Sequence, residues 1–367
     1  MTPWYHINHI EKVDSPALIV YPQRVKENIA RLIKMAGDVD ALRPHVKTNK
    51  IAEVCAMMLE AGIKRFKCAT IAEAEMLAII KAPDVLIAHQ PVGPKMERLW
   101  QLVIQFPDTH FTCIIDNFPT AKALSELFTA KGERLQLYID LNIGMNRSGI
   151  IPEKALQLFK DCQSLPSVRI IGLHGYDGHI RDSDLAERNQ HSDEAFNKVD
   201  MLHKEISAIA AHPIQIVAGG SPSFPTHIKR KGVQISPGTF VFWDWGYKHL
   251  VPDEPFEYAA LVITRIISII DETTICTDLG HKSVAAENPL PRVHFLNAPD
   301  AVPVGQSEEH LVMKVPHTNQ WKVGAVLYGV PVHICPTVAL YDSAVIVENN
   351  EVVDNWKVVA RGRKITI

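Results

Sequence analysis

Lys47 is the residue whose type and position are best suited to covalent chemistry. It closes the β-rich run Arg43–Pro–His–Val–Lys–Thr48. If this run is a strand of a parallel barrel, Lys47 stands at the strand's C-terminal end, where barrel enzymes place catalytic groups. An amine held there by apolar walls and neighbouring cations loses its proton near neutral pH and attacks a carbonyl. The alternative is an ordinary lysine that extends into water.

Two glycine-rich turns are candidates for anion binding, and each follows a run typical of a buried strand. Their residues are Gly219, Gly220 and Ser221 in the first turn, and Gly238 and Thr239 in the second. Glycine permits close backbone approach, and successive N–H groups with hydroxyls form a concave phosphate site. A phosphate site and a lysine at one barrel mouth favour pyridoxal 5′-phosphate, bonded to Lys47 as an imine.

Two further strand-end loops carry groups suited to an aromatic cofactor. Arg147 lies among small residues in the run 140–149, and it either hydrogen-bonds the cofactor ring or pairs with a surface carboxylate. Tyr176 and His179 lie in the run 172–179, where an aromatic or imidazole group can cover the ring. A structural turn explains the glycines of that run equally well.

A histidine and a cysteine two residues apart form a candidate metal pair. His333 and Cys335 belong to the run Pro331–Val–His–Ile–Cys–Pro–Thr337. Residues two apart on a strand point to the same face, so both side chains can bind one ion. A nitrogen and a thiolate ligand suit zinc, with manganese as an alternative. The other interpretation is core packing. The run Ser307–Glu–Glu–His310 is a possible source of another ligand or supporting carboxylate.

The elements that must position these residues alternate between short β-rich runs and amphipathic helical runs. Nine strands are predicted, at 17–21, 41–47, 65–70, 85–89, 110–116, 135–140, 168–173, 214–218 and 233–236. Helices are predicted between them, for example at 24–35 and 71–80. Such alternation indicates parallel strands with crossover helices, in an open sheet or a closed barrel. Without the run 17–21, which then pairs elsewhere, eight strands remain for a (β/α)8 TIM-type barrel.

After about residue 243 the pattern changes to short β-like runs with few helices between them. These runs are 258–270, 273–278, 310–315, 325–328, 345–347 and 356–367. We therefore predict a barrel domain at 12–245 and an all-β domain that consists of residues 246–367 together with residues 1–11. The alternative is one barrel with an extended tail.

Composition restricts the class of protein. The 367 residues are 47% hydrophobic and 22% charged, with a net charge of -3. This balance argues against nucleic-acid or anionic-membrane partners, which require a basic excess. No apolar run is long enough to span a bilayer, the start does not resemble a secretory signal, and the six cysteines are scattered. We expect a cytoplasmic enzyme.

Four segments taken in order are similar to one known family. They are Ser15–Pro–Ala–Leu–Ile–Val, Arg43–Pro–His–Val–Lys–Thr, the loop Gly175–Tyr–Asp–Gly–His and Pro331–x–His–x–Cys. Together they resemble the D-threonine aldolase and D-serine dehydratase family of alanine-racemase-like, fold-type III pyridoxal-phosphate enzymes, across nearly the whole chain. Val332 departs from the asparagine that often precedes the family's metal histidine.

The resemblance implies a barrel, a C-terminal β domain, a homodimer and a D-amino acid substrate. It makes Lys47 the imine lysine, with Arg147 and Tyr176 beside the ring. It places Gly219, Gly220, Ser221, Gly238 and Thr239 at the phosphate, and His333 and Cys335 at the metal.

The reaction stays open between two lyases. The Gly–Tyr–Asp–Gly–His loop resembles the aldolases, which cleave D-3-hydroxy amino acids to glycine and an aldehyde, whereas His-x-Cys resembles the D-serine dehydratases. Three further functions also stay open: an amino-acid racemase, a non-catalytic pyridoxal-phosphate carrier and a cofactor-free metal-dependent hydrolase.

Overall fold

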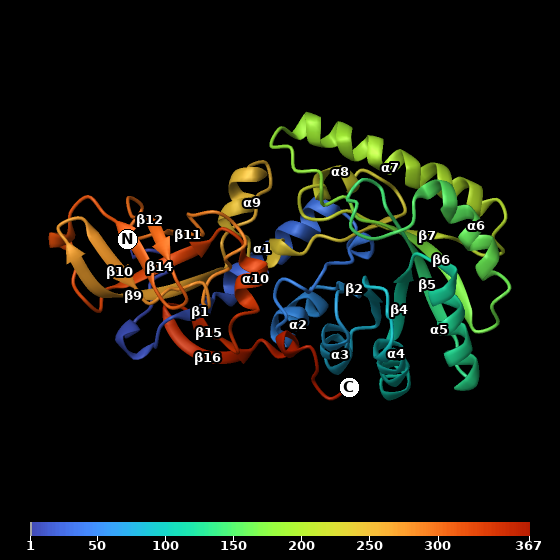
Figure 1. The fold of residues 1–367 in the computed structure, drawn as a ribbon, viewed down its shortest axis with the longest axis horizontal. Coiled ribbons are helices and arrows are strands. Elements are labelled where there is room, and N and C mark those ends of the chain that lie inside the picture. Colours follow the sequence, from blue (N-terminus) through green and yellow to red (C-terminus); the bar gives the residue numbers. More distant parts are fainter. Residues whose placement is uncertain (1) are drawn as a thin grey trace. The chain divides into compact units, whose positions relative to one another are not determined.

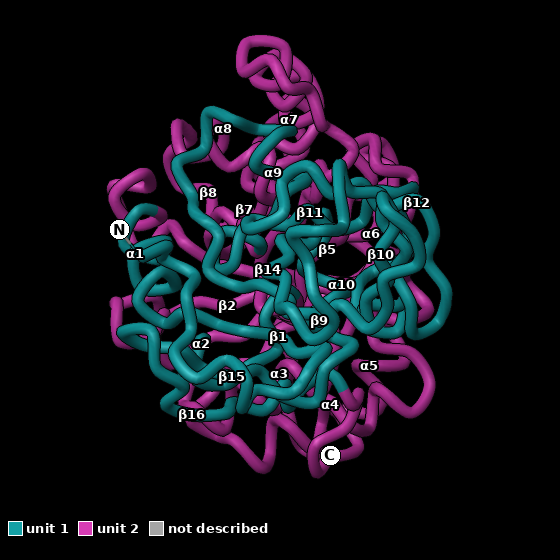
Figure 2. The backbone as a smooth tube through the Cα atoms, turned by 90° about the vertical axis from the view of Figure 1, so that its left-hand side faces the viewer, with its two compact units in different colours: residues 1–31, 48–54, 239–361 teal, residues 32–47, 55–238, 362–367 magenta. Residues whose placement is uncertain are grey.

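The computed structural model describes residues 2–367. The chain divides into two compact units, coloured separately in Figure 2. Unit 1 contains residues 1–31, 48–54 and 239–361, and unit 2 contains residues 32–47, 55–238 and 362–367. The chain passes between the units several times. The domain boundaries given above, 12–245 and 246–367 with 1–11, stay predictions.

Unit 2 is built on a curled sheet of parallel strands in sequence order. Its strands are β2 Arg65–Cys68, β3 Asp84–Ile87, β4 His110–Ile115, β5 Leu135–Leu141, β6 Val168–Gly175, β7 Gln215–Ala218 and β8 Val233–Ile235. Helices alternate with these strands and lie outside them (Figure 1): α3 Ile71–Ile79, α4 Pro94–Gln105, α5 Phe118–Ala130, α6 Pro152–Cys162, α7 Leu185–Ser207 and α8 Phe224–His227. The predicted alternation of strands and helices is confirmed.

The segment 42–47 completes the barrel, although it is not a regular strand. Leu42 forms a parallel bridge with Ile235 of β8, and His45 forms one with Lys67 of β2. Because Pro44 lacks an N–H, the ladder between these two bridges is irregular. The buried Arg43 reinforces the closure, since its guanidinium donates to both carboxylate oxygens of Asp84, at 2.7 and 2.9 Å. The predicted strand at 41–47 is thus an irregular closing segment.

Apolar side chains fill the middle of the barrel, and the polar residues beyond them face its mouth. The buried cluster draws one residue from each of β3 to β7, namely Leu86, Ile114, Tyr138, Ile171 and Val217. Its members point inward because side chains alternate along each strand. Polar inward residues nearer the C-terminal ends of the strands therefore face the barrel mouth.

Unit 1 contains a mixed sheet, with the predicted run 17–21 inside it. β1, Ala17–Val20, pairs antiparallel with β9, Ala260–Asp271, and parallel with β15, Ser343–Glu348. The remaining strands are β10 Thr274–Thr277, β11 Val293–Phe295, β12 Val302–Gln306, β13 Leu311–Lys314, β14 Val326–Pro331 and β16 Glu351–Lys357. β1 therefore lies outside the barrel, as the count of eight required.

Four further helices lie in unit 1 or have residues in both units. They are α1 Pro22–Ala36, α2 Ala52–Glu60, α9 Trp245–Leu250 and α10 Ile334–Val338. None of the helices within residues 2–367 is long and apolar enough to cross a membrane.

The predicted strand at 356–367 is wrong. β16 runs from Glu351 to Lys357, and a 3-10 turn follows at Val359–Gly362. β16 pairs with β15 at one edge of the sheet. Its side chains are therefore largely exposed and polar, and they do not show the apolar alternation of a half-buried strand.

Candidate active site

Lys47 lies at the end of the closing segment, two residues after the bridge between His45 and Lys67. Its Nζ atom is 5.7 Å from the centroid of the Tyr176 ring. Tyr176 directly follows β6, so both residues lie at the C-terminal end of the barrel strands. The side chain of Lys47 is only partly exposed. The structure thus brings the predicted imine lysine to the predicted ring-covering tyrosine.

Arg147 joins the same ring from the loop after β5. Its guanidinium carbon is 5.0 Å from the Tyr176 centroid. The negative face of an aromatic ring attracts cations, so Tyr176 holds both positive side chains near one place. Glycines allow this position: a Cβ on Gly178 would lie 2.2 Å from Tyr176 Oη, and one on Gly220 would lie 3.0 Å from the ring.

Three charged or polar groups that sequence reasoning did not single out lie inside the same barrel end. Lys67 Nζ is 3.4 Å from His174 Nε2, and His174 Nδ1 is 2.7 Å from Asp140 Oδ1. Ser148 donates to the other oxygen of Asp140 at 3.0 Å. Lys67, His174 and Asp140 are all buried. In the sequence, each of these residues can be recognised as a polar residue at an inward-facing position of a short strand that is otherwise apolar.

Burial and pairing set the pKa values of this group. Burial raises the pKa of the Asp140 carboxyl, but the hydrogen bonds from His174 and Ser148 and the charges nearby together outweigh it, and the pKa lies below its usual value. Burial lowers the pKa of His174, and the Asp140 hydrogen bond only partly opposes this. Asp140 is therefore the anionic member and His174 the neutral one at pH 7.

The first glycine turn is held by a buried network below it. Gly219 has a φ of +80°, and a Cβ there would lie 2.6 Å from the His227 ring. His227 Nε2 is 2.8 Å from Asp177 Oδ2, and Ser223 Oγ donates to Asp177 Oδ1 at 2.7 Å. Gly220 N in turn donates to Ser223 Oγ at 3.2 Å. Asp177 thus fixes the loop that was predicted to bind phosphate.

The two glycine turns are connected, and their surroundings fit a phosphate group. Gly238 N donates to Ser221 Oγ at 3.3 Å. Ser236, just after β8, is buried, and its hydroxyl has no hydrogen-bond partner among residues 2–367. A buried hydroxyl without a partner indicates a polar ligand nearby. Several of the turn N–H groups expected to be free instead bond within the protein, including those of Gly219 and Gly238.

We expect Asp177→Asn to lower the free energy of unfolding by about 3 kcal/mol at pH 7, because it breaks a buried charged network. His227 and Ser223 hold the pKa of Asp177 below its usual value against the opposing effect of burial. The stabilisation is therefore present above the usual carboxyl pKa and is lost as pH falls through the lower folded value.

Denaturant unfolding at pH 7 and at about pH 3 measures this loss. The gap between wild type and Asp177→Asn should narrow at the lower pH. Asp200→Asn, which removes an exposed ion pair with Lys204, is the matched control and should cost under about 1 kcal/mol. Equal costs for the two variants would refute the network's role.

His333 and Cys335 contact each other, but not on a strand as predicted. β14 ends at Pro331, His333 caps helix α10, and Cys335 lies in the helix's first turn. The two side chains lie close enough for each to shift the pKa of the other. Pro336 in the first turn of a helix is compatible with it, since N–H groups there have no helical partner. The prediction that this pair lies on a strand is wrong, and its role in binding a metal stays a prediction.

The charges around this pair fit a divalent metal. Burial lowers the pKa of His333, but the interaction with Cys335 outweighs burial and raises this pKa to about 9. In the same way, His333 lowers the pKa of the Cys335 thiol although burial raises it. Glu287 Oε1 lies 2.5 Å from His333 Nδ1 and orients the ring, as carboxylates do for metal-binding histidines. Thr48 Oγ1 and Thr239 Oγ1 lie 3.1 and 3.5 Å from Cys335 Sγ.

The donor set is limited to this nitrogen and this sulfur. No group of three or more His, Cys, Asp or Glu side chains in residues 2–367 is arranged to hold a metal ion. The carboxylates of the run 307–310 pair with Lys282 instead, so they are not the additional group expected there. An imidazole and a thiolate still suit zinc with open positions for other ligands.

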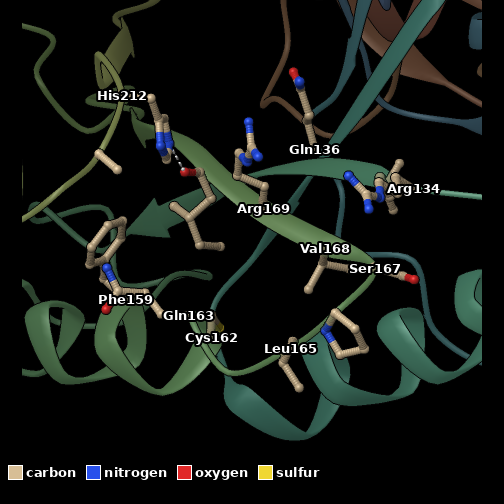
Figure 3. Close-up of a pocket in the computed structure, with 14 residues that line it drawn as sticks. Arg134, Gln136, Phe159, Cys162, Gln163, Leu165, Ser167, Val168, Arg169 and His212 are labelled. Atoms are coloured by element: carbon tan, nitrogen blue, oxygen red, sulfur yellow. Dashed lines mark hydrogen bonds between the residues drawn. The ribbon is translucent and has the colours of Figure 1, made fainter.

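A separate pocket of about 570 Å³ lies at the opposite ends of β5 and β6. Figure 3 shows its lining, with Arg134 and Arg169 near the strands and Phe159 and Cys162 on the helix side. None of the predicted site residues lines it. The pocket is therefore distinct from the barrel mouth where Lys47 and Tyr176 meet.

Comparison with known proteins agrees with this arrangement. A family model described as "Alanine racemase, N-terminal domain" matches residues 20–244, more than half of the chain. The chain belongs to this family. A second model, "Putative serine dehydratase domain", matches residues 259–347 of this alanine-racemase family member.

Relatives of this family member cover almost the whole chain. A D-threonine aldolase from Arthrobacter sp. is 26% identical, over 96% of this chain and 94% of its own. A D-serine dehydratase from Dictyostelium discoideum is 21% identical, over 95% of this chain and 97% of its own. The crystal structure of D-threonine aldolase from Filomicrobium marinum has a TM-score of 0.88 at 26% identity, covering 95% and 96%. The barrel with a C-terminal strand-rich part is thereby confirmed.

Proposed function

We propose that this chain is a pyridoxal-phosphate- and divalent-metal-dependent lyase that cleaves D-3-hydroxy amino acids to glycine and an aldehyde. The observation that carries the proposal is the meeting of Lys47 and Arg147 at the Tyr176 ring, at the C-terminal end of the barrel. The D-threonine aldolase relative, similar over 96% of this chain, supports the reaction class. A 3-hydroxy-D-aspartate aldolase from Paracoccus denitrificans, 25% identical over 96%, supports it further.

In this proposal, different residues at the barrel mouth bind different parts of the cofactor. Lys47 provides the amine that bonds the cofactor aldehyde, and Tyr176 and Arg147 flank its ring. The loops at 219–221 and 238–239, with Ser236, bind the phosphate through hydroxyl and backbone donors. When bound, pyridoxal 5′-phosphate supplies an electron sink that stabilises negative charge at the substrate's α-carbon.

His333 and Cys335 hold the metal, and Glu287 keeps the imidazole oriented toward it. A divalent cation supplies Lewis acidity toward the substrate's β-oxygen, which favours deprotonation of that hydroxyl and Cα–Cβ cleavage. Thr48, which contacts Cys335, directly follows Lys47 in the chain. We propose zinc as the metal because a thiolate is one of the ligands, with manganese as the alternative.

A D-amino acid dehydratase is the second candidate, and Cys335 is the observation that favours it, since His-x-Cys resembles the dehydratases. A D-threo-3-hydroxyaspartate dehydratase from Delftia sp. is 23% identical over 94% of this chain. A Cys-to-Ala variant of a D-threo-3-hydroxyaspartate dehydratase has been solved in a metal-free form. We further propose a cytoplasmic homodimer with neither nucleic-acid nor membrane partners.

The test is to incubate the full-length chain, loaded with cofactor and zinc or manganese, with D-threonine and D-serine, with and without a chelator. We expect glycine and acetaldehyde from D-threonine only in the metal-loaded arm, and no reaction of L-threonine, the control substrate. Keto acid from D-serine without aldehyde from D-threonine would replace the aldolase with the dehydratase. Interconversion of D- and L-isomers alone would indicate a racemase, and no turnover at all would favour the carrier.

A further inference from the structure

The cavity at the N-terminal ends of β5 and β6 is not used by the proposed function. Its volume of about 570 Å³ is typical of a site for a small molecule. Figure 3 shows Arg169 and Gln136 on one side of these strands, and Val168, Leu165 and Phe159 on the other. The cavity thus has a polar wall toward the inside of the barrel and an apolar wall toward the helices.

The polar wall follows from the register of the two strands. Side chains alternate along a strand, and Tyr138 and Ile171 belong to the cluster inside the barrel. Gln136 and Arg169 each lie two residues earlier, so both face inward at the N-terminal end. They are also directly opposite one another in the parallel pairing of β5 with β6. Arg134 immediately precedes β5 and lines the same cavity.

Other polar side chains at this end of the barrel bond to one another. Arg43, which pairs with Asp84, also donates from Nε to Gln234 Oε1 at 2.6 Å. Gln234 Nε2 donates to Gln215 Oε1 at 3.0 Å, and Tyr138 Oη donates to the same oxygen at 2.6 Å. This part of the barrel end therefore supplies its own hydrogen-bond partners.

Arg134, Gln136 and Arg169 have no such partners. Among residues 2–367, neither arginine forms an ion pair, and none of the three side chains forms a hydrogen bond. Two guanidinium groups without a carboxylate at one cavity attract anions. The planar donors of a guanidinium also match a carboxylate or a phosphate in a bidentate pair. Both arginines are exposed, so an anion from solution can reach them.

We propose that this cavity is a binding site for a small dianion, a phosphate-bearing or dicarboxylate compound with a short apolar portion. Arg134 and Arg169 pair with its negative charges, and the Gln136 amide donates to one of its oxygens. The apolar portion contacts Phe159 and Leu165. This inference goes beyond the proposed function and does not depend on it, because no residue of the barrel mouth lines the cavity.

Isothermal titration calorimetry at low ionic strength tests the proposal with inorganic phosphate, succinate and acetate as probes. The full-length chain is loaded with pyridoxal 5′-phosphate, which occupies the proposed phosphate site at the barrel mouth. It is kept free of metal, which would itself bind these anions. We expect about one phosphate or succinate per chain, and acetate at least about tenfold weaker, because one negative charge engages only one arginine. The dianion that binds more tightly identifies the ligand as phosphate-bearing or dicarboxylate.

Arg134→Gln and Arg169→Gln should each raise the dissociation constant of the tighter dianion at least about tenfold, the loss expected for one charge-assisted pair. Both residues are exposed, so the variants should keep the wild-type circular dichroism spectrum. Arg169→Lys keeps the charge without the paired donors and should give an intermediate constant. Lys160→Gln, at an exposed lysine of α6 outside the lining, is the matched control and should bind as wild type.

Equal dissociation constants in the wild type and in both arginine-to-glutamine variants would overturn the inference. So would the absence of saturable binding of phosphate and succinate up to about 50 mM. Ser236→Ala, at the barrel mouth, should leave dianion binding unchanged, and a loss there would place the bound anion at the mouth instead. Failure of the proposed function looks different, because the chain then takes up no pyridoxal 5′-phosphate while the two arginine variants still weaken the binding of succinate.

Discussion

Replacing Lys47 with alanine is expected to abolish the near-visible imine absorbance and to reduce turnover at least about a thousandfold. The side chain lies at the Tyr176 ring, where no other lysine except Lys67 is placed by the contacts within residues 2–367. The fold should survive, because Lys47 is only partly buried and its backbone N–H contact to His45 Nδ1 stays available to alanine.

Absorbance after addition of pyridoxal 5′-phosphate, together with aldehyde release from D-threonine, measures the effect. Lys64→Ala, at an exposed lysine of the same unit, is the matched control and should behave as wild type. A Lys47→Ala chain with a normal band would show that another amine binds the cofactor.

The second large effect is expected at the metal pair. His333→Ala should reduce bound zinc from about one ion per chain to nearly none and reduce D-threonine cleavage about a hundredfold or more, because it removes one of two protein ligands. The near-visible band should persist, since Lys47 is untouched. Elemental analysis for zinc and near-visible absorbance, measured on the same sample, distinguish a loss of the metal from a loss of the cofactor.

His310→Ala, at an exposed histidine of the same unit, is the control for His333→Ala. Metal uptake should also depend on pH. The ligands must lose their protons to bind, and in the metal-free chain Cys335 raises the pKa of His333 to about 9. Uptake should therefore be weaker at pH 6 than at pH 8. A His333→Ala chain that keeps both its zinc and its activity would contradict the assignment.

Much of the barrel could be predicted because its signal is local. Short β-rich runs alternate with amphipathic helices, and the ends of β4 to β8 were predicted to within a few residues. The closing segment at 42–47 was harder, because Pro44 prevents a regular ladder and only tertiary bridges reveal the pairing. β16 was not predicted, because an exposed edge strand does not need an apolar face that the sequence pattern would reveal.

The residues of the candidate site also fall into those that the sequence could predict and those that it could not. Lys47, Arg147 and Tyr176 could be singled out because they end strands or follow them, and the structure brings them together. Lys67, His174 and Asp140 could not, because each lies within a strand-like run and their contacts join β2, β5 and β6. Glu287 is 46 residues from His333, so sequence spacing gave no reason to pair them.

Reduction with borohydride followed by peptide mass analysis is the most direct test of the central claim. Borohydride converts an imine to a stable amine and so marks the residue that holds the cofactor. We predict that the yellow protein bleaches and that the phosphopyridoxyl group is found on the peptide containing Lys47. A label on Lys67 or any other lysine, or a chain that takes up no label at all, would contradict this account.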